Sequence, residues 1–120
     1  MKKLFVALVA AALAACSVLP VSPEQQIRDG ANAVTATATV ATSLLKLEKI
    51  TVKQAQNYRA MLGTASLHLD TANVTLLECR KKTSSSPATN PDPCKPTVES
   101  DIGLAVSVAG EVSKVLETKR

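Results

Sequence analysis

Hydrophobic residues recur at alternating steps of three and four along three stretches of the chain, a spacing typical of amphipathic helices. In the second stretch this period continues without interruption over seven consecutive steps. Its apolar positions are Ala55, Tyr58, Leu62, Ala65, Leu69, Ala72, Leu76 and Cys79. In the third stretch they are Val98, Ile102, Ala105, Ala109, Val112 and Leu116. The pattern predicts helices at about 23–47, 51–81 and 97–118.

The first stretch allows two interpretations. Its apolar positions Ile27, Ala31, Val34, Ala38, Ala41 and Leu45 fit one face of a helix. Residues 34–40 also alternate apolar residues with threonine, which is a strand pattern. We favour the helix because alanine is the best helix former and no similar segment nearby could pair as a hairpin.

Two sites carry the signals of a helix start. Ser22 precedes Pro23, and Gln25 stands where it could complete a capping box with Ser22. Thr51 and Gln54 have the same spacing before the second helix. Both sites therefore predict a helix beginning at the next residue.

The chain begins with Lys2, Lys3 and an uncharged apolar run, followed by Leu13-Ala14-Ala15-Cys16. A positive start, a short apolar segment and small residues are typical of a secretory signal peptide, and the run is too short to span a bilayer. The last four residues resemble the lipobox of bacterial lipoproteins. The alternative is an ordinary cleaved signal peptide with an incidental cysteine.

The resemblance implies that Cys16 receives a diacylglycerol and becomes the first residue of the mature chain. It divides the chain into a lipoprotein signal peptide at 1–15, a lipidated tether at 16–22 and a helical domain at 23–120. Ser17 resembles the sorting pattern for transfer to the outer membrane. Removal of Lys2 and Lys3 would lower the formal net charge of +4 by two.

An exported chain with two further cysteines predicts a disulfide, because the compartment outside the inner membrane is oxidising. Cys79 lies at the end of the second helix, and Cys94 lies before the third. Between them, a loop rich in proline and serine at 83–96 cannot hold regular structure. Two unpaired thiols are the alternative. A bridge would close about 15 residues and contribute roughly 3 kcal/mol.

These elements predict an all-α fold: a lipid-tethered antiparallel three-helix bundle with a disulfide-closed loop between the second and third helices. Gly63, Gly103 and Gly110 interrupt the helical segments. We expect them to permit close approach of a neighbouring backbone, because the helix faces consist largely of small residues. Such a lean core also suits self-association or docking of a partner helix.

Candidate chemistry is sparse, and we expect no enzymatic activity, metal or cofactor. The single histidine, His68, lacks a partner at helical spacing, and the serines at 84–86 lack a positioned base. Tyr58 lies on the periodic face, which indicates a core position. The basic residues at 80–82 favour neutralisation of a helix dipole over a lipid-headgroup or partner site. With aromatic residues at 2% of the chain, nucleic-acid binding is not expected.

The leading interpretation is a non-catalytic envelope lipoprotein at the periplasmic face of the outer membrane. The acylated Cys16 would enter the membrane lipid, and the helical module would contact an envelope protein or a second copy, with no small-molecule substrate. The mature chain looks like small envelope lipoproteins, including those of phages and prophages. Two alternatives are a lysis protein resembling the outer-membrane subunit of phage spanins, and a lipoprotein that excludes superinfecting phage.

Overall fold

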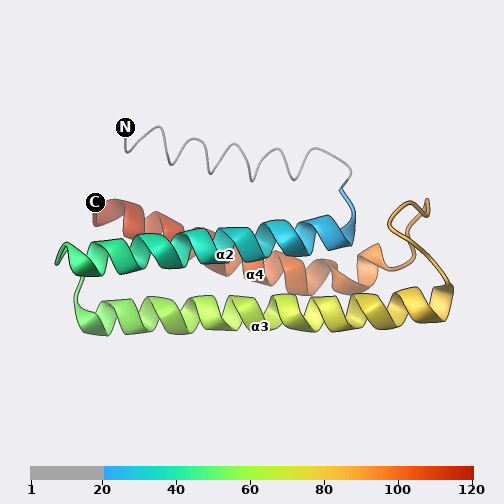
Figure 1. Cartoon of the computed structure of the whole chain (residues 1–120), viewed down its shortest axis with the longest axis horizontal. Helices are drawn as coiled ribbons and strands as arrows, with labels where there is room; N and C mark the ends of the chain where they lie inside the picture. Colours follow the sequence, from blue (N-terminus) through green and yellow to red (C-terminus); the bar gives the residue numbers. More distant parts are fainter. Residues whose placement is uncertain (1–20) are drawn as a thin grey trace.

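Three helices account for most of the residues that the computed structural model describes, which are 21–120 (Figure 1). They are α2 (Pro23–Lys46), α3 (Val52–Thr83) and α4 (Lys95–Thr118). Between residues 21 and 120 there is no β-strand, so the predicted all-helical class is confirmed for this part. The segment at 34–40 is helical. The predicted signal peptide and Cys16 lie outside the described residues.

The three helices lie side by side, and the chain reverses direction at each connection (Figure 1). Each helix packs against both of the others. The longest dimension is 51 Å, close to the length of α3. The start of α2, the end of α3 and the start of α4 therefore meet at one end of the molecule. The turn between α2 and α3 lies at the other end, together with the end of α4.

Both predicted caps are present, but only one forms a complete capping box. The Ser22 hydroxyl accepts a hydrogen bond from the Gln25 backbone N–H at 3.2 Å. The Gln25 side chain does not return to Ser22, because its amide donates instead to Asp29 at 2.9 Å. At the start of α3, Thr51 and Gln54 form both bonds of the box, at 3.1 and 2.9 Å.

The predicted faces of α3 and α4 form the core. All six apolar positions predicted for α4 are buried. On α3 every predicted position is buried except Tyr58 and Cys79, which are partly buried and packed against the core. The uninterrupted hydrophobic pattern of each segment was therefore sufficient to locate the buried faces of α3 and α4.

The predicted face of α2 is correct only in part: Ala41 is buried and Ala31 is exposed, whereas the other four predicted positions, Ile27, Val34, Ala38 and Leu45, are partly buried and packed against the core. The buried positions are Pro23, Gly30, Thr37, Ala41 and Leu44. Thr37 can be buried because its hydroxyl donates to the Ala33 carbonyl at 2.8 Å, which satisfies its polar group. Glycine and threonine are not hydrophobic residues, so the hydrophobic pattern of the sequence leaves out Gly30 and Thr37. The buried side of α2 is therefore only partly visible in the sequence.

The close approach of a neighbouring backbone expected at three glycines is absent there, and the tight contact at a fourth, Gly30, is with a side chain. An added Cβ at Gly63, Gly103 or Gly110 would meet nothing within 4 Å, which contradicts the expectation for those positions. A Cβ at Gly30 would lie 3.0 Å from a methyl carbon of Leu69. The helices come close at the middle of the molecule, where α3 and α4 contribute mainly alanine to the core.

The connection between α3 and α4 is shorter than expected. Helix α3 continues to Thr83, two residues beyond the predicted end, and α4 begins at Lys95, two residues before the predicted start. Ser84 ends α3 in the left-handed conformation with φ of 50°. The irregular segment is therefore confined to 84–94.

Candidate functional site

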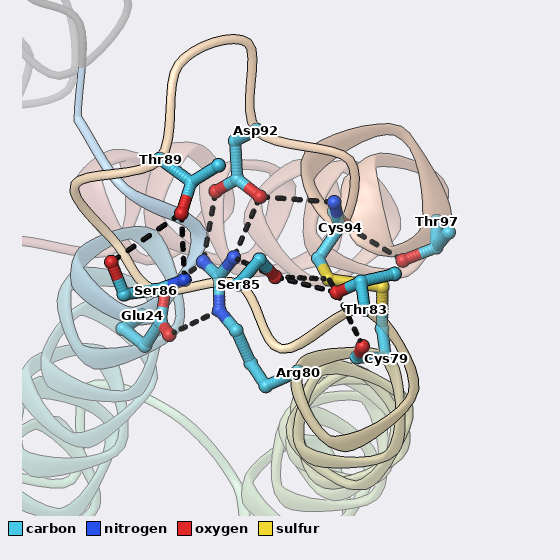
Figure 2. Close-up of a disulfide and its surroundings, with 10 residues drawn as sticks. All are labelled: Glu24, Cys79, Arg80, Thr83, Ser85, Ser86, Thr89, Asp92, Cys94 and Thr97. Atoms are coloured by element: carbon cyan, nitrogen blue, oxygen red, sulfur yellow. Dashed lines mark hydrogen bonds and ion pairs between the residues drawn. A yellow bond between two sulfur atoms is a disulfide. The ribbon is translucent and has the colours of Figure 1, made fainter.

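A disulfide joins the end of α3 to the start of α4, as predicted. It connects Cys79 and Cys94, which are 15 residues apart in sequence, with a Cα–Cα distance of 5.7 Å. Cys94 is fully buried, whereas Cys79 is partly buried. The bridge therefore closes the loop over its own end of the core (Figure 2).

Beside the disulfide, Arg80 lies between two carboxylates (Figure 2). Its Nε and Nη2 donate to the two oxygens of Glu24 at 3.0 and 2.9 Å. Nη1 and Nη2 donate to the two oxygens of Asp92 at 2.7 and 2.8 Å, and Nη1 also donates to the Ser85 hydroxyl at 3.1 Å. A guanidinium has five N–H donors. All five are used here.

The charges of this cluster stabilise one another. Hydrogen bonds from Arg80 hold the pKa values of Glu24 and Asp92 below their usual range. Hydrogen bonds to Asp92 and then Glu24 raise the pKa of Arg80. The Arg80 side chain is only 11% exposed, so water screens these contacts less than those of a typical surface ion pair. The two carboxylates therefore stay ionised at a lower pH than free aspartate and glutamate side chains do.

The ion cluster and the disulfide form one structural unit. Asp92 accepts a hydrogen bond from the backbone N–H of Cys94 at 2.9 Å. The Ser85 hydroxyl, which contacts Arg80, lies 3.4 Å from the Cys94 sulfur. Glu24 extends the unit to the first turn of α2. Because Arg80 has no donor left, we interpret this unit as a clamp that joins three chain segments, and not as a ligand site.

The basic residues at 80–82 were interpreted as one group at the end of a helix, but they divide into two kinds. Arg80 points inward and holds the clamp. Lys81 and Lys82 are exposed in the last turn of α3, where cations complement the helix dipole. Sequence reasoning missed the roles of Glu24 and Asp92, because Glu24 is 56 residues from Arg80.

His68 has a partner that local spacing could not identify. Its Nδ1 lies 3.3 Å from an oxygen of Asp101 on α4. The two side chains are 33% and 29% exposed. Within residues 21–120, no three histidine, cysteine or acidic residues gather as a metal site would require. The pair therefore contributes a partly buried contact between α3 and α4.

Several large aliphatic side chains remain on the surface. They are Leu47, Val52, Met61, Leu67, Val74, Leu77, Leu104 and Val115. Scattered exposed hydrophobic residues are normal, so only those that share a face are informative. Leu67, Val74 and Leu77 share the side of α3 turned away from the core, and we call this set the outer stripe of α3.

Comparison with known proteins identifies no relative. No protein-family model matches the chain, and no curated protein or solved structure is similar to it at a significant level. Across the described helices, none combines the length and the apolar character needed to cross a bilayer.

Proposed function

We propose that this chain is a lipid-anchored, non-catalytic envelope protein at the periplasmic face of the outer membrane. An acylated Cys16 holds a small antiparallel three-helix bundle through the tether at 16–22. The bundle presents its outer surface to another protein of the envelope. It has no substrate and no cofactor.

One observation carries this proposal, and it is the order of parts at the start of the sequence. Two lysines, an uncharged apolar run and Leu13-Ala14-Ala15-Cys16 follow one another at the depth expected of a lipobox. A single acyl chain binds a membrane only reversibly, whereas two or more give stable attachment. A diacylglyceryl group on Cys16 would therefore anchor the whole bundle.

The structure is compatible with an anchor at this position. The tether ends at Ser22, which caps α2, so the first folded turn lies seven residues or fewer from the lipid. In that turn Glu24 is bound by Arg80, which also holds Asp92 of the loop. Force on the tether is therefore transmitted to α3 and to the disulfide-closed loop, and does not unravel α2 alone.

Membrane fractionation of a cysteine variant tests the proposal. Cys16→Ser removes the acceptor thiol, so we expect the chain to move from the membrane to the soluble periplasmic fraction. The matched control is Cys79→Ser/Cys94→Ser, which also removes cysteines but leaves the lipobox intact and is expected to stay in the membrane. Unchanged membrane association of Cys16→Ser would contradict the proposal.

A further inference from the structure

The outer stripe of α3 is a second apolar face on a helix that already contributes one face to the core. Leu67, Val74 and Leu77 are 66%, 56% and 59% exposed. Their spacings of seven and three place them on one side of the helix. In Figure 1 both α2 and α4 lie on one side of α3, and no described element lies on its opposite side. The longest helix of the bundle therefore has an apolar surface that no other part of residues 21–120 covers.

Two residues of opposite charge lie on the same side of α3 as the outer stripe. Asp70 and Lys81 are exposed, and neither forms an ion pair within residues 21–120. They are eleven residues apart, which is about three turns of helix, so they share a face but lie roughly 16 Å from each other. They therefore cannot neutralise each other within one chain.

The stripe is complementary to itself when one copy is turned end for end. Asp70 stands four residues before Val74, and Lys81 stands four residues after Leu77. In an antiparallel register that places Val74 against Leu77 of the second copy, Asp70 therefore faces Lys81 of the second copy. A parallel register would instead place Asp70 against Asp70 and Lys81 against Lys81. Like charges in such positions are destabilising.

The surface of the stripe is also hollowed where the second copy would contact it. Val74, Leu77, Glu78, Arg80 and Lys81 line an open depression of about 500 Å³. Its surface is mainly aliphatic, with the charged groups of Glu78 and Lys81 beside it. An aliphatic side chain flanked by a carboxylate, such as Val74 with Asp70, matches this combination.

We propose that a second copy of this chain docks antiparallel on the outer stripe of α3, with Val74 packed on Leu77 and Asp70 paired with Lys81 across a two-fold axis. Such an isologous contact closes on itself and yields a dimer. This inference rests on the proposed function, because it identifies the envelope partner as the chain itself.

In this antiparallel register, both copies can be attached to the same membrane. The axis passes between Val74 and Leu77, near the end of α3 that lies beside the start of α2 (Figure 1). The overlap then covers the last four turns or so of each α3, about 20–25 Å. In each copy α2 begins beside the part of α3 that holds Val74 and Leu77, because Gly30 lies against Leu69 and Glu24 binds Arg80. Both tethers therefore lie near the middle of the dimer, from which two lipid anchors can enter the same bilayer.

Two aliphatic residues and two charges from each copy, with Leu67 at the edge of the overlap, make a small interface. Stable complexes usually bury about 1,200 Å² or more, so we expect weak association in free solution. Confinement of both copies to a membrane raises their effective concentration and shifts the equilibrium towards the dimer. The anchor and the stripe thus act together.

Zero-length carbodiimide cross-linking of the acylated full chain in its own membranes tests the register. The reagent joins a carboxylate to an amine in contact, and Asp70 is too far from Lys81 within one chain. We therefore expect a dimer whose cross-linked peptides join Asp70 to Lys81. Absence of this product from acylated protein would overturn the inference.

Charge exchange gives an independent test by energy transfer between donor- and acceptor-labelled copies on vesicles. Asp70→Lys and Lys81→Asp should each lower transfer about tenfold, and the double variant should restore it. Leu77→Ser should also lower transfer, whereas Leu104→Ser, an exposed leucine of α4, should not. Equal transfer by all variants would overturn the proposal.

A further measurement distinguishes absence of the lipid anchor from absence of the dimer. Mass spectrometry of the cross-linked sample reports whether Cys16 carries acyl chains. If it does not, Cys16→Ser chains with an N-terminal histidine tag are tethered to vesicles of phosphatidylcholine with a nickel-chelating lipid. Charge-dependent transfer on these vesicles supports the dimer without the anchor, and transfer that is absent or insensitive to charge exchange overturns it.

Discussion

At the residue scale, Arg80 has the largest structural role of the side chains described. It satisfies all five of its donors with two carboxylates and a hydroxyl, and it does so beside the disulfide. Lysine could not replace it, because an ammonium has three donors and no planar fork to match two carboxylates at once. The clamp thus depends on this residue type as well as on its charge.

Loss of Arg80 should destabilise the fold. Arg80→Met keeps the length of the side chain but leaves Glu24 and Asp92 without their common partner. We expect the free energy of unfolding to fall by about 2 kcal/mol, measured by urea denaturation at neutral pH. Lys81→Met, the adjacent exposed position, should change it by less than about 0.5 kcal/mol. Equal effects of the two substitutions would refute a special role for Arg80.

The clamp also predicts how stability depends on pH. The pKa values of Glu24 and Asp92 are lowered in the folded chain, so their contribution is complete above about pH 5 and is lost as the pH falls through those lowered values. The difference in unfolding free energy between wild type and Arg80→Met should therefore shrink as the pH falls from neutral to about 2. A difference that stays constant over this range would contradict the assignment.

The glycines provide a second prediction. Gly63, Gly103 and Gly110 have open space at the Cβ position, so alanine should stabilise each helix by up to about 1 kcal/mol. Gly30→Ala gains the same helix propensity but forces Leu69 to move, and we expect it to gain less than any of the others. Thermal unfolding of the four single variants ranks them, and a ranking with Gly30→Ala first would show that the contact with Leu69 imposes no constraint.

At the scale of elements, the buried face of a helix could be predicted where hydrophobic residues occupy all of its buried positions. The faces of α3 and α4 follow directly from the alternating steps of three and four. The face of α2 follows only in part, because glycine and a threonine with an internally bonded hydroxyl occupy interior positions. Whether a small or polar residue is buried depends on the side chains opposite it on other helices. The sequence around that residue does not contain this information.

The disulfide is the element-scale feature with the largest predicted effect. Cys79→Ser/Cys94→Ser opens a loop of 15 residues, and we expect the free energy of unfolding to fall by about 3 kcal/mol. Wild-type protein in reductant should show the same loss, since both treatments remove the same restraint. Unfolding curves that coincide for the oxidised protein and the double variant would show that the bridge does not stabilise the fold.

At the scale of the whole molecule, the cysteine count and the export expected from the signal-peptide pattern were enough to predict the disulfide, but not the clamp beside it. The clamp joins Glu24, Arg80 and Asp92, which come from two helices and a loop. Its only local signal was a basic residue at the end of a helix, and that signal has a simpler explanation in the helix dipole. The outer stripe of α3 was equally hidden, because its significance depends on which side of α3 faces the core.

Mass spectrometry of the purified mature protein tests most directly whether Cys16 carries a lipid. We expect an N-terminal peptide that begins at Cys16 and carries the added mass of a diacylglyceryl group. A peptide that begins at another residue, or an unmodified Cys16 in membrane-derived protein, would contradict the proposal.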